Sequence, residues 1–139
     1  MKNLSLLATL LLTTAAMAGE AFDGTTPLDC MPQQGHDCLP GEQSCKPLKP
    51  EPGKDLTMHF DVSKKSLRTP YRYDTLPIGS VSNNKKSLVM QGTSLQLVWS
   101  ATIHRTTGRM TLAIADREGA YVIFGQCQAP RPRSSDVAQ

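Results

Sequence analysis

Residues 95–127 read LQLVWSATIHRTTGRMTLAIADREGAYVIFGQC. Apolar residues alternate with polar or small ones through most of 95–103 and again through 110–115. A period of two is typical of a strand with one buried face. Two short loops that contain glycine, at 106–108 and 116–119, separate the alternating runs and favour tight hairpins. The stretch therefore predicts a three-stranded antiparallel meander.

The same period extends upstream to residue 54. Residues 56–63 alternate strictly, and residues 67–73 and 87–91 are shorter extended candidates. No stretch of ten residues shows the 3.6-residue period of a helix. We therefore expect residues 54–127 to form one mostly β domain, a small antiparallel barrel or sandwich of about six or seven strands stapled by disulfides.

The chain before this domain has a different composition. Residues 19–53 hold six of the ten prolines and three of the four cysteines. Because proline lacks the backbone donor that helices and central strands need, we expect an irregular Pro-rich segment here. Residues 128–139, QAPRPRSSDVAQ, offer little to pack against a core, and we expect a disordered tail.

Residues 1–18 have the form of an export signal. Lys2 precedes a mostly apolar run over 4–16, and Ala16-Met17-Ala18 places small residues where a signal peptidase reads them. We predict cleavage after Ala18 and a periplasmic or secreted protein. An uncleaved anchor is the alternative, but the run is shorter than the roughly 20 residues of a membrane span. No second such run follows, so we expect no transmembrane segment in the mature chain.

Four cysteines follow the signal, and an even number in an exported chain predicts two disulfides. We favour Cys30–Cys38 with Cys45–Cys127, because the second bond would tie the Pro-rich segment to the last strand and close a long loop. The swapped pairing, Cys30–Cys127 with Cys38–Cys45, stays open. Zinc held by His36 and the first three cysteines is less favoured, because the cysteines are spaced more widely than in zinc sites. We expect no metal and no cofactor.

Two histidines are candidates for chemistry. His59 and Asp61 share one face of a strand and would suit a base and its orienting carboxylate. No nucleophile motif accompanies them, and an exposed polar face is the simpler interpretation. His104 and Arg105 end the long strand of the meander, and with Arg109 they form a cationic corner. Such a corner could bind a carboxylate or phosphate, or it could only keep a hairpin tip hydrated.

The net charge of the whole chain is +3 over 139 residues, of which 39% are hydrophobic and 19% are charged. These values exclude a highly charged disordered chain and argue against nucleic-acid binding. Tyr71 and Tyr73 lie in a basic region that predicts contact with an anionic glycan or lipid or with another envelope protein. The same region would equally well neutralise the acidic residues of 19–53. Its basic residues are Lys64, Lys65, Arg68, Arg72, Lys85 and Lys86.

The chain resembles small exported bacterial β proteins of uncharacterised function, which combine a Cys-rich N-terminal segment with a C-terminal strand ending in G-x-C. The likeness is carried by Cys38, Cys45, the hairpin IHRTTGRM at 103–110 and Gly125-Gln126-Cys127. It covers the last third of the chain and the cysteines. The resemblance implies export and a stapled β fold, and it implies no site.

Three functions remain open on these grounds. The first is a non-enzymatic binding or structural accessory module of the cell envelope, which we favour over an enzyme because no complete catalytic motif is present. The second is a small-ligand carrier with an internal apolar cavity. The third is a hydrolase that uses His59 and Asp61 or His104 and Arg105. The cavity of a carrier would be lined by residues such as Trp99, Leu97, Met58 and Phe60.

Overall fold

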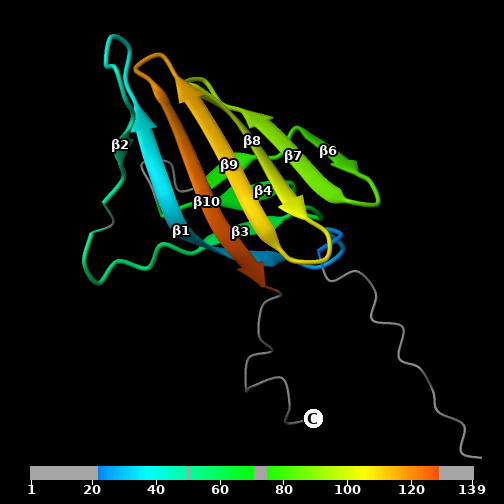
Figure 1. Cartoon of the computed structure of the whole chain (residues 1–139). Helices are drawn as coiled ribbons and strands as arrows, with labels where there is room; N and C mark the ends of the chain where they lie inside the picture. Colours follow the sequence, from blue (N-terminus) through cyan, green and yellow to red (C-terminus); the bar gives the residue numbers. More distant parts are fainter. Residues whose placement is uncertain (1–21, 50, 71–74, 129–139) are drawn as a thin grey trace, which may run out of the picture.

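The computed structural model describes residues 22–49, 51–70 and 75–128. These residues form one antiparallel sheet, curled into a half-barrel, in the order β5-β4-β3-β1-β10-β9-β8-β7-β6, with β2 paired to β1 (Figure 1). The strands are β1 (Leu28–Cys38), β2 (Lys46–Pro47), β3 (Met58–Asp61), β4 (Ser66–Arg68), β5 (Thr75–Pro77), β6 (Ser80–Asn83), β7 (Ser87–Thr93), β8 (Leu97–His104), β9 (Arg109–Asp116) and β10 (Ala120–Gln128).

The predicted meander is confirmed as β8, β9 and β10, which pair in sequence order. Gly108 adopts a φ of 71° in the first turn, which L residues rarely do. In the second turn, the Asp116 carboxylate accepts hydrogen bonds from the amides of Glu118 and Gly119. Leu95, at the start of the alternating run, is 105% exposed and lies outside β8.

The Pro-rich segment is less irregular than its composition predicts. Its residues 28–38 form β1, the longest described strand, which lies in the middle of the sheet between β3 and β10. The register of β1 against β10 shifts between Pro32 and Gln34. A bulge of this kind is where a strand tolerates proline. The sheet therefore crosses the boundary that the sequence placed after residue 53.

The core lies inside the curl. Alternate residues are buried throughout β7 and β8, in the first half of β9 and in the second half of β10, so the period-two pattern and the buried face coincide there. Trp99 is 3% exposed and packs edge to face on Phe60, with ring centroids 6.3 Å apart. The predicted fold class, a mostly β antiparallel domain stapled by disulfides, is confirmed, although the described chain has ten strands rather than six or seven.

The structure contains two disulfides, and the pairing that we favoured is wrong. Cys30 bonds to Cys127 and Cys38 bonds to Cys45. Cys30 lies directly opposite Cys127 in the β1–β10 ladder, with 3.9 Å between the Cα atoms. Strand register, which loop-length arguments ignore, therefore decides the pairing. Cys38 and Cys45 close the loop that joins β1 to β2.

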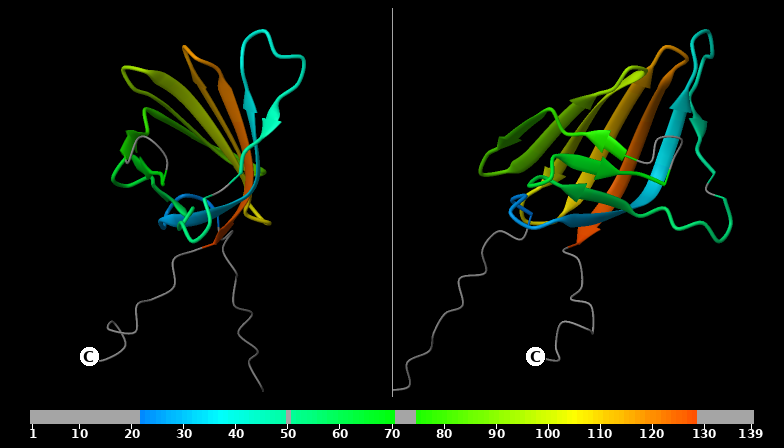
Figure 2. Two further views of the ribbon diagram at one scale, coloured as in Figure 1. Left: turned by 90° about the vertical axis from the view of Figure 1, so that its left-hand side faces the viewer. Right: turned by 180° about the vertical axis from the view of Figure 1, so that it is seen from behind.

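The two ends of the sheet are joined by the short link from β5 to β6. Figure 2 shows the curl from the side and from behind, with this link crossing between the two halves. The Gly79 amide donates to the Gln91 carbonyl of β7 at 2.8 Å. Gly92, also on β7, lies against the Pro77 carbonyl and the Trp99 indole so closely that a Cβ atom there would overlap both. Glycine is thus required where the half-barrel draws its edges together.

Some predictions lie outside the described residues. These are the signal at 1–18, Tyr71, Tyr73 and, apart from Gln128 of β10, the tail at 128–139. In the described part of the chain we found no helix of the length and apolarity needed to cross a membrane.

Replacing both Cys30 and Cys127 by alanine should lower the free energy of unfolding by about 5 kcal/mol, and replacing Cys38 and Cys45 by about 2.5 kcal/mol. The difference follows from the sequence separations of 97 and 7 residues, because the unfolded chain regains more freedom when the longer loop opens. Urea unfolding of both variants in non-reducing buffer measures it. Equal losses would show that loop length does not set the contribution of each bond.

Gly92→Ala should destabilise the protein by about 3 kcal/mol or more, because neither the Pro77 carbonyl nor the buried indole can retreat. Gly79→Ala is the matched control. Its new methyl would approach only the Gln91 carbonyl, at 3.7 Å, and should change stability by less than about 1 kcal/mol. Thermal unfolding of both variants compares the two positions, and similar melting temperatures would contradict a tight closure at Gly92.

Candidate functional site

The outward-facing residues of β8, β9 and β10 form one continuous surface, which we call the outer face. They lie in cross-strand rows set by the register of the meander. No acidic residue is among them, and the only basic ones, His104 and Arg109, lie at the same end. Apart from Gln128 at the end of β10, which lies beyond these rows, the outer face consists of Val98, Ser100, Thr102, His104, Arg109, Thr111, Ala113, Ala115, Ala120, Val122, Phe124 and Gln126.

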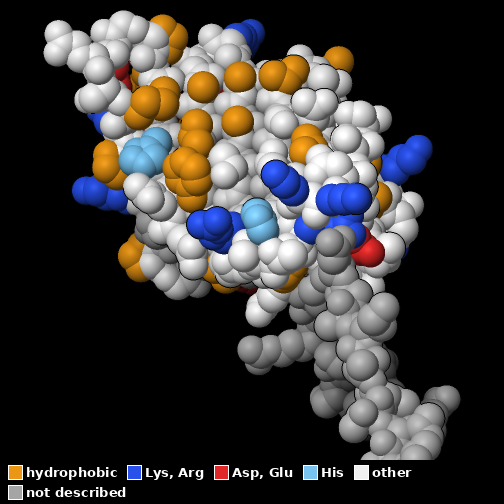
Figure 3. All heavy atoms as spheres, turned by 45° about the vertical axis from the view of Figure 1, so that its right-hand side comes forward, with side chains coloured by type: hydrophobic (Ala, Val, Ile, Leu, Met, Phe, Trp, Pro, Cys, Tyr) orange, Lys and Arg blue, Asp and Glu red, His pale blue; other side chains and the backbone are white. Residues whose placement is uncertain are grey.

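Figure 3 shows hydrophobic side chains gathered over the upper part of this region, with Lys and Arg side chains along its lower edge. The exposed fraction is 53% for Val98 and 41% for Phe124. Exposed apolar residues are ordinary when isolated, but a contiguous group of them marks an interaction surface.

Two adjoining hollows mark the outer face. The first has a volume of about 580 Å³ and runs along the alanine-rich rows, where short side chains leave space above the sheet. It is bordered by Val98, Ala113, Ala115 and Val122. The second has a volume of about 370 Å³ and lies at the basic end, where it is lined by both His104 and Arg109.

The His104 ring is held by the turn that follows it. Its Nδ1 atom lies 3.3 Å from the Thr107 amide, which can only donate, and 3.1 Å from the Thr106 hydroxyl. Nδ1 is therefore the acceptor, and in the neutral ring Nε2 carries the proton. The ring consequently offers one N–H donor that the turn does not use.

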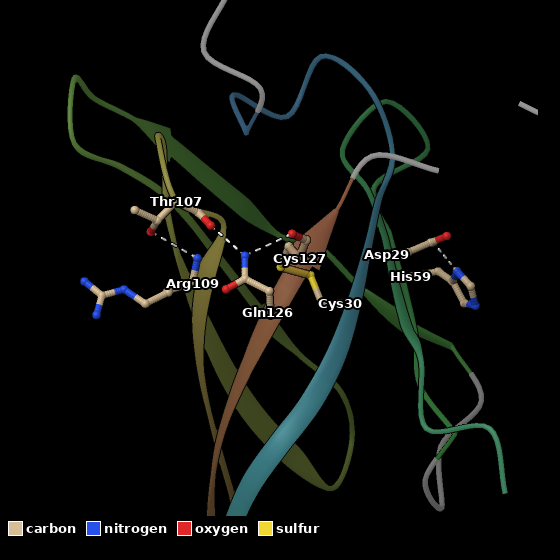
Figure 4. Close-up of a disulfide and its surroundings, with 7 residues drawn as sticks. All are labelled: Asp29, Cys30, His59, Thr107, Arg109, Gln126 and Cys127. Atoms are coloured by element: carbon tan, nitrogen blue, oxygen red, sulfur yellow. Dashed lines mark hydrogen bonds and ion pairs between the residues drawn. A yellow bond between two sulfur atoms is a disulfide. The ribbon is translucent and has the colours of Figure 1, made fainter. Parts of the chain in front are cut away.

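Arg109 follows the same turn. Among the described residues its guanidinium makes no hydrogen bond or ion pair, and Figure 4 shows the side chain pointing away from the barrel. Gln126 supports the turn, because its Nε2 atom donates to the Thr107 carbonyl at 2.6 Å. Arg105 points elsewhere, since its Nη1 atom donates to the Asn83 side chain at 2.5 Å and to the Asn84 carbonyl at 2.9 Å. The predicted corner is thus divided, with two of its three residues lining a hollow.

His59 and Asp61 do not act as a pair in the described structure. The Nδ1 atom of His59 lies 2.5 Å from the Asp29 carboxylate on the neighbouring strand (Figure 4). Asp61 accepts hydrogen bonds from the Ser63 hydroxyl at 2.7 Å and the Lys64 amide at 3.0 Å. These two bonds lower the pKa of the Asp61 carboxyl. Asp61 therefore serves the turn between β3 and β4.

The four residues predicted to line an internal cavity are all buried in the core. Leu97, Met58 and Phe60 are at most 6% exposed and line none of the hollows described in this part of the chain. Trp99 borders the first hollow, which lies on the outer face. A third hollow, of about 240 Å³, lies between β1 and the segment around Leu48.

A zinc site built on the cysteines is inconsistent with the structure, because all four sulfur atoms are in disulfides. Within the described ranges no three His, Cys, Asp or Glu side chains come together as metal ligands would.

The alanine-rich hollow was not anticipated from the sequence. Ala113 and Ala115 alternate with Leu112 and Ile114 in the run TLAIA at 111–115. An outward position on an exposed strand usually carries a polar or charged residue, so successive alanines there were the available signal. Gln126, whose role depends on the neighbouring hairpin, had no signal in its local sequence.

No protein-family model, curated protein sequence or solved structure matches this chain. The resemblance to small exported β proteins with a G-x-C strand therefore stays a prediction.

Lowering the pH should reduce stability partly through Asp61. Its folded pKa is lowered by Ser63 and Lys64, so its contribution is complete above the unfolded value, near 3.8, and is lost as the pH falls through the lower folded value. Asp61→Asn should reduce the free energy of unfolding at pH 7 and flatten its decline below about pH 5. Urea midpoints between pH 7 and pH 2.5 measure both effects, with Glu51→Gln as the exposed control. An unchanged pH profile for Asp61→Asn would contradict the assignment.

Proposed function

We propose that this protein is an exported, non-enzymatic binding module of the cell envelope and that its outer face receives the partner. The observation that carries the proposal is the combination of an exposed face without acidic residues and two adjoining hollows, one apolar and one ending in His104 and Arg109. A rigid sheet presents these groups with little loss of conformational freedom on binding.

Export is supported by two independent features. The first is the form of residues 1–18, with a basic start, an apolar run and Ala-Met-Ala at the end. The second is the presence of two disulfides, which persist in oxidising compartments and are rare in reducing ones.

The two alternative functions draw less support from the geometry. A carrier needs an enclosed apolar space, whereas the side chains expected to line it are packed on one another, as Phe60 and Trp99 are. The predicted hydrolase needs His59 beside Asp61, whereas Asp61 bonds to its own turn and His59 contacts Asp29. His59 and Asp29 do form a base and carboxylate pair, but among the described residues no hydroxyl or thiol is hydrogen-bonded to the His59 ring to serve as a nucleophile. An outer-face binding module requires neither arrangement.

A photo-cross-linking amino acid at position 98 tests the proposal. Val98 is an exposed outer-face residue that borders the first hollow. In the full chain, exported by the cells that make it, we expect illumination to yield a defined adduct with another envelope component.

Val81 is the matched control. It is also an exposed valine, at 42%, but it pairs with the inward-facing Met90 and so lies on the other side of the sheet. Position 81 should yield no such adduct. Equal products at both positions, or none at position 98, would overturn the assignment of the outer face.

A further inference from the structure

We infer that the outer face binds an amphiphile with an anionic head, with the head at His104 and Arg109 and the hydrocarbon chain along the alanine-rich hollow. The inference rests on the proposed function and adds the chemical class of the partner.

The basic end supplies the recognition of the anion. Arg109 presents a planar guanidinium that suits two oxygens of a phosphate or carboxylate, and His104 adds the Nε2–H donor. Neither hollow is lined by an acidic residue that would compete for them. Lys85 and Lys86 belong to the turn between β6 and β7, next to Ser87, which also lines the second hollow. Their charges raise the local concentration of anions.

The alanine-rich hollow provides the space for the hydrocarbon chain of the amphiphile. The row of Ser100, Ala113 and Val122 borders the first hollow, and the next row, Thr102, Thr111 and Phe124, borders the second. The two hollows therefore lie next to each other along the strands. From His104 to Val98 the distance is six positions of β8, or roughly 20 Å at about 3.3 Å per residue. A long alkyl chain extended from the basic end fits this length.

Two other occupants fit the same face less well. An extended acidic peptide would place its N–H and C=O groups over the first hollow, whose β9 and β10 side carries Ala113 and Ala115, which cannot bond to them. Apart from Tyr121 of β10, the polar side chains that line this hollow are confined to its β6–β8 side, and they are Ser80, Gln91, Thr93 and Ser100. A second copy packed face to face would bring no acidic outer-face side chain to Arg109, because none exists. An alkyl chain has neither difficulty, since it needs no hydrogen bonds, and its anionic head group would bind His104 and Arg109.

Calorimetric titration of the purified protein with octyl, decyl and dodecyl phosphate, below their micelle-forming concentrations, tests the inference. We expect saturable binding that tightens about twofold per added methylene, since an open hollow covers only one side of the chain. Dodecyltrimethylammonium and inorganic phosphate separate the two parts of the site. Both should bind at least about tenfold more weakly than dodecyl phosphate, because each lacks one of the two sets of contacts.

Matched variants assign the residues. Arg109→Gln should weaken dodecyl phosphate about tenfold, whereas Arg117→Gln, the same change in the turn between β9 and β10, should leave it unaltered. Ala113→Gln fills the first hollow and should weaken every alkyl phosphate, whereas Ser82→Gln on exposed β6 should not. Circular dichroism establishes that each variant is folded.

Several results would overturn the ligand class. These are equal binding of the quaternary ammonium and the phosphate amphiphile, equal effects of Arg109→Gln and Arg117→Gln, or no binding of any alkyl phosphate. A dimer in sedimentation velocity that Ala113→Gln dissociates would assign the face to a second copy. If position 98 cross-links a protein while no alkyl phosphate binds, the proposed function stands and only the ligand class fails. If neither occurs, both fail.

Discussion

The bond between Cys30 and Cys127 joins the two strands on which the rest of the sheet depends. β1 pairs with β10 along most of its length, and in the strand order β3, β4 and β5 follow on from β1. The other half, from β9 to β6, extends from β10. Both sulfur-bearing residues are buried in the core, at 0% and 2% exposure. The staple therefore fixes the two halves of the half-barrel at the line where they meet.

The same region supports the basic end of the outer face. The amide of Cys127 donates to the Gly108 carbonyl at 2.8 Å, and the neighbouring Gln126 side chain donates to the Thr107 carbonyl. These bonds hold the turn from which His104 and Arg109 project. The groups that we propose to bind an anion are thus supported by the disulfide-linked strand, which is an arrangement that gives a site rigidity.

The inward and outward faces of the curled sheet carry different kinds of side chain. The inward residues are large and closely packed, and their burial stabilises the fold. Small outward residues, above all Ala113 and Ala115, contribute little to that core. They instead border the first hollow, because two short side chains on one strand leave space above the sheet. The residues that stabilise the core are therefore different from those that border the hollow of the proposed binding surface.

The local sequence was sufficient to predict the meander, the burial of Trp99 and the presence of two disulfides. The signals for these features are alternation, turn glycines and an even number of cysteines, which are local or compositional. The local sequence was insufficient to predict β1, because the proline-rich composition of its segment argued against a central strand, whereas β1 itself holds only Pro32, which lies at the register shift. The partner of Cys30 and the distinct roles of Arg105 and Arg109 depend on strand register. Register is a relation between segments far apart in the chain, and it is settled when the whole sheet buries one face. Alternation thus specified which side chains face inward, and the packing of distant strands specified which of them meet.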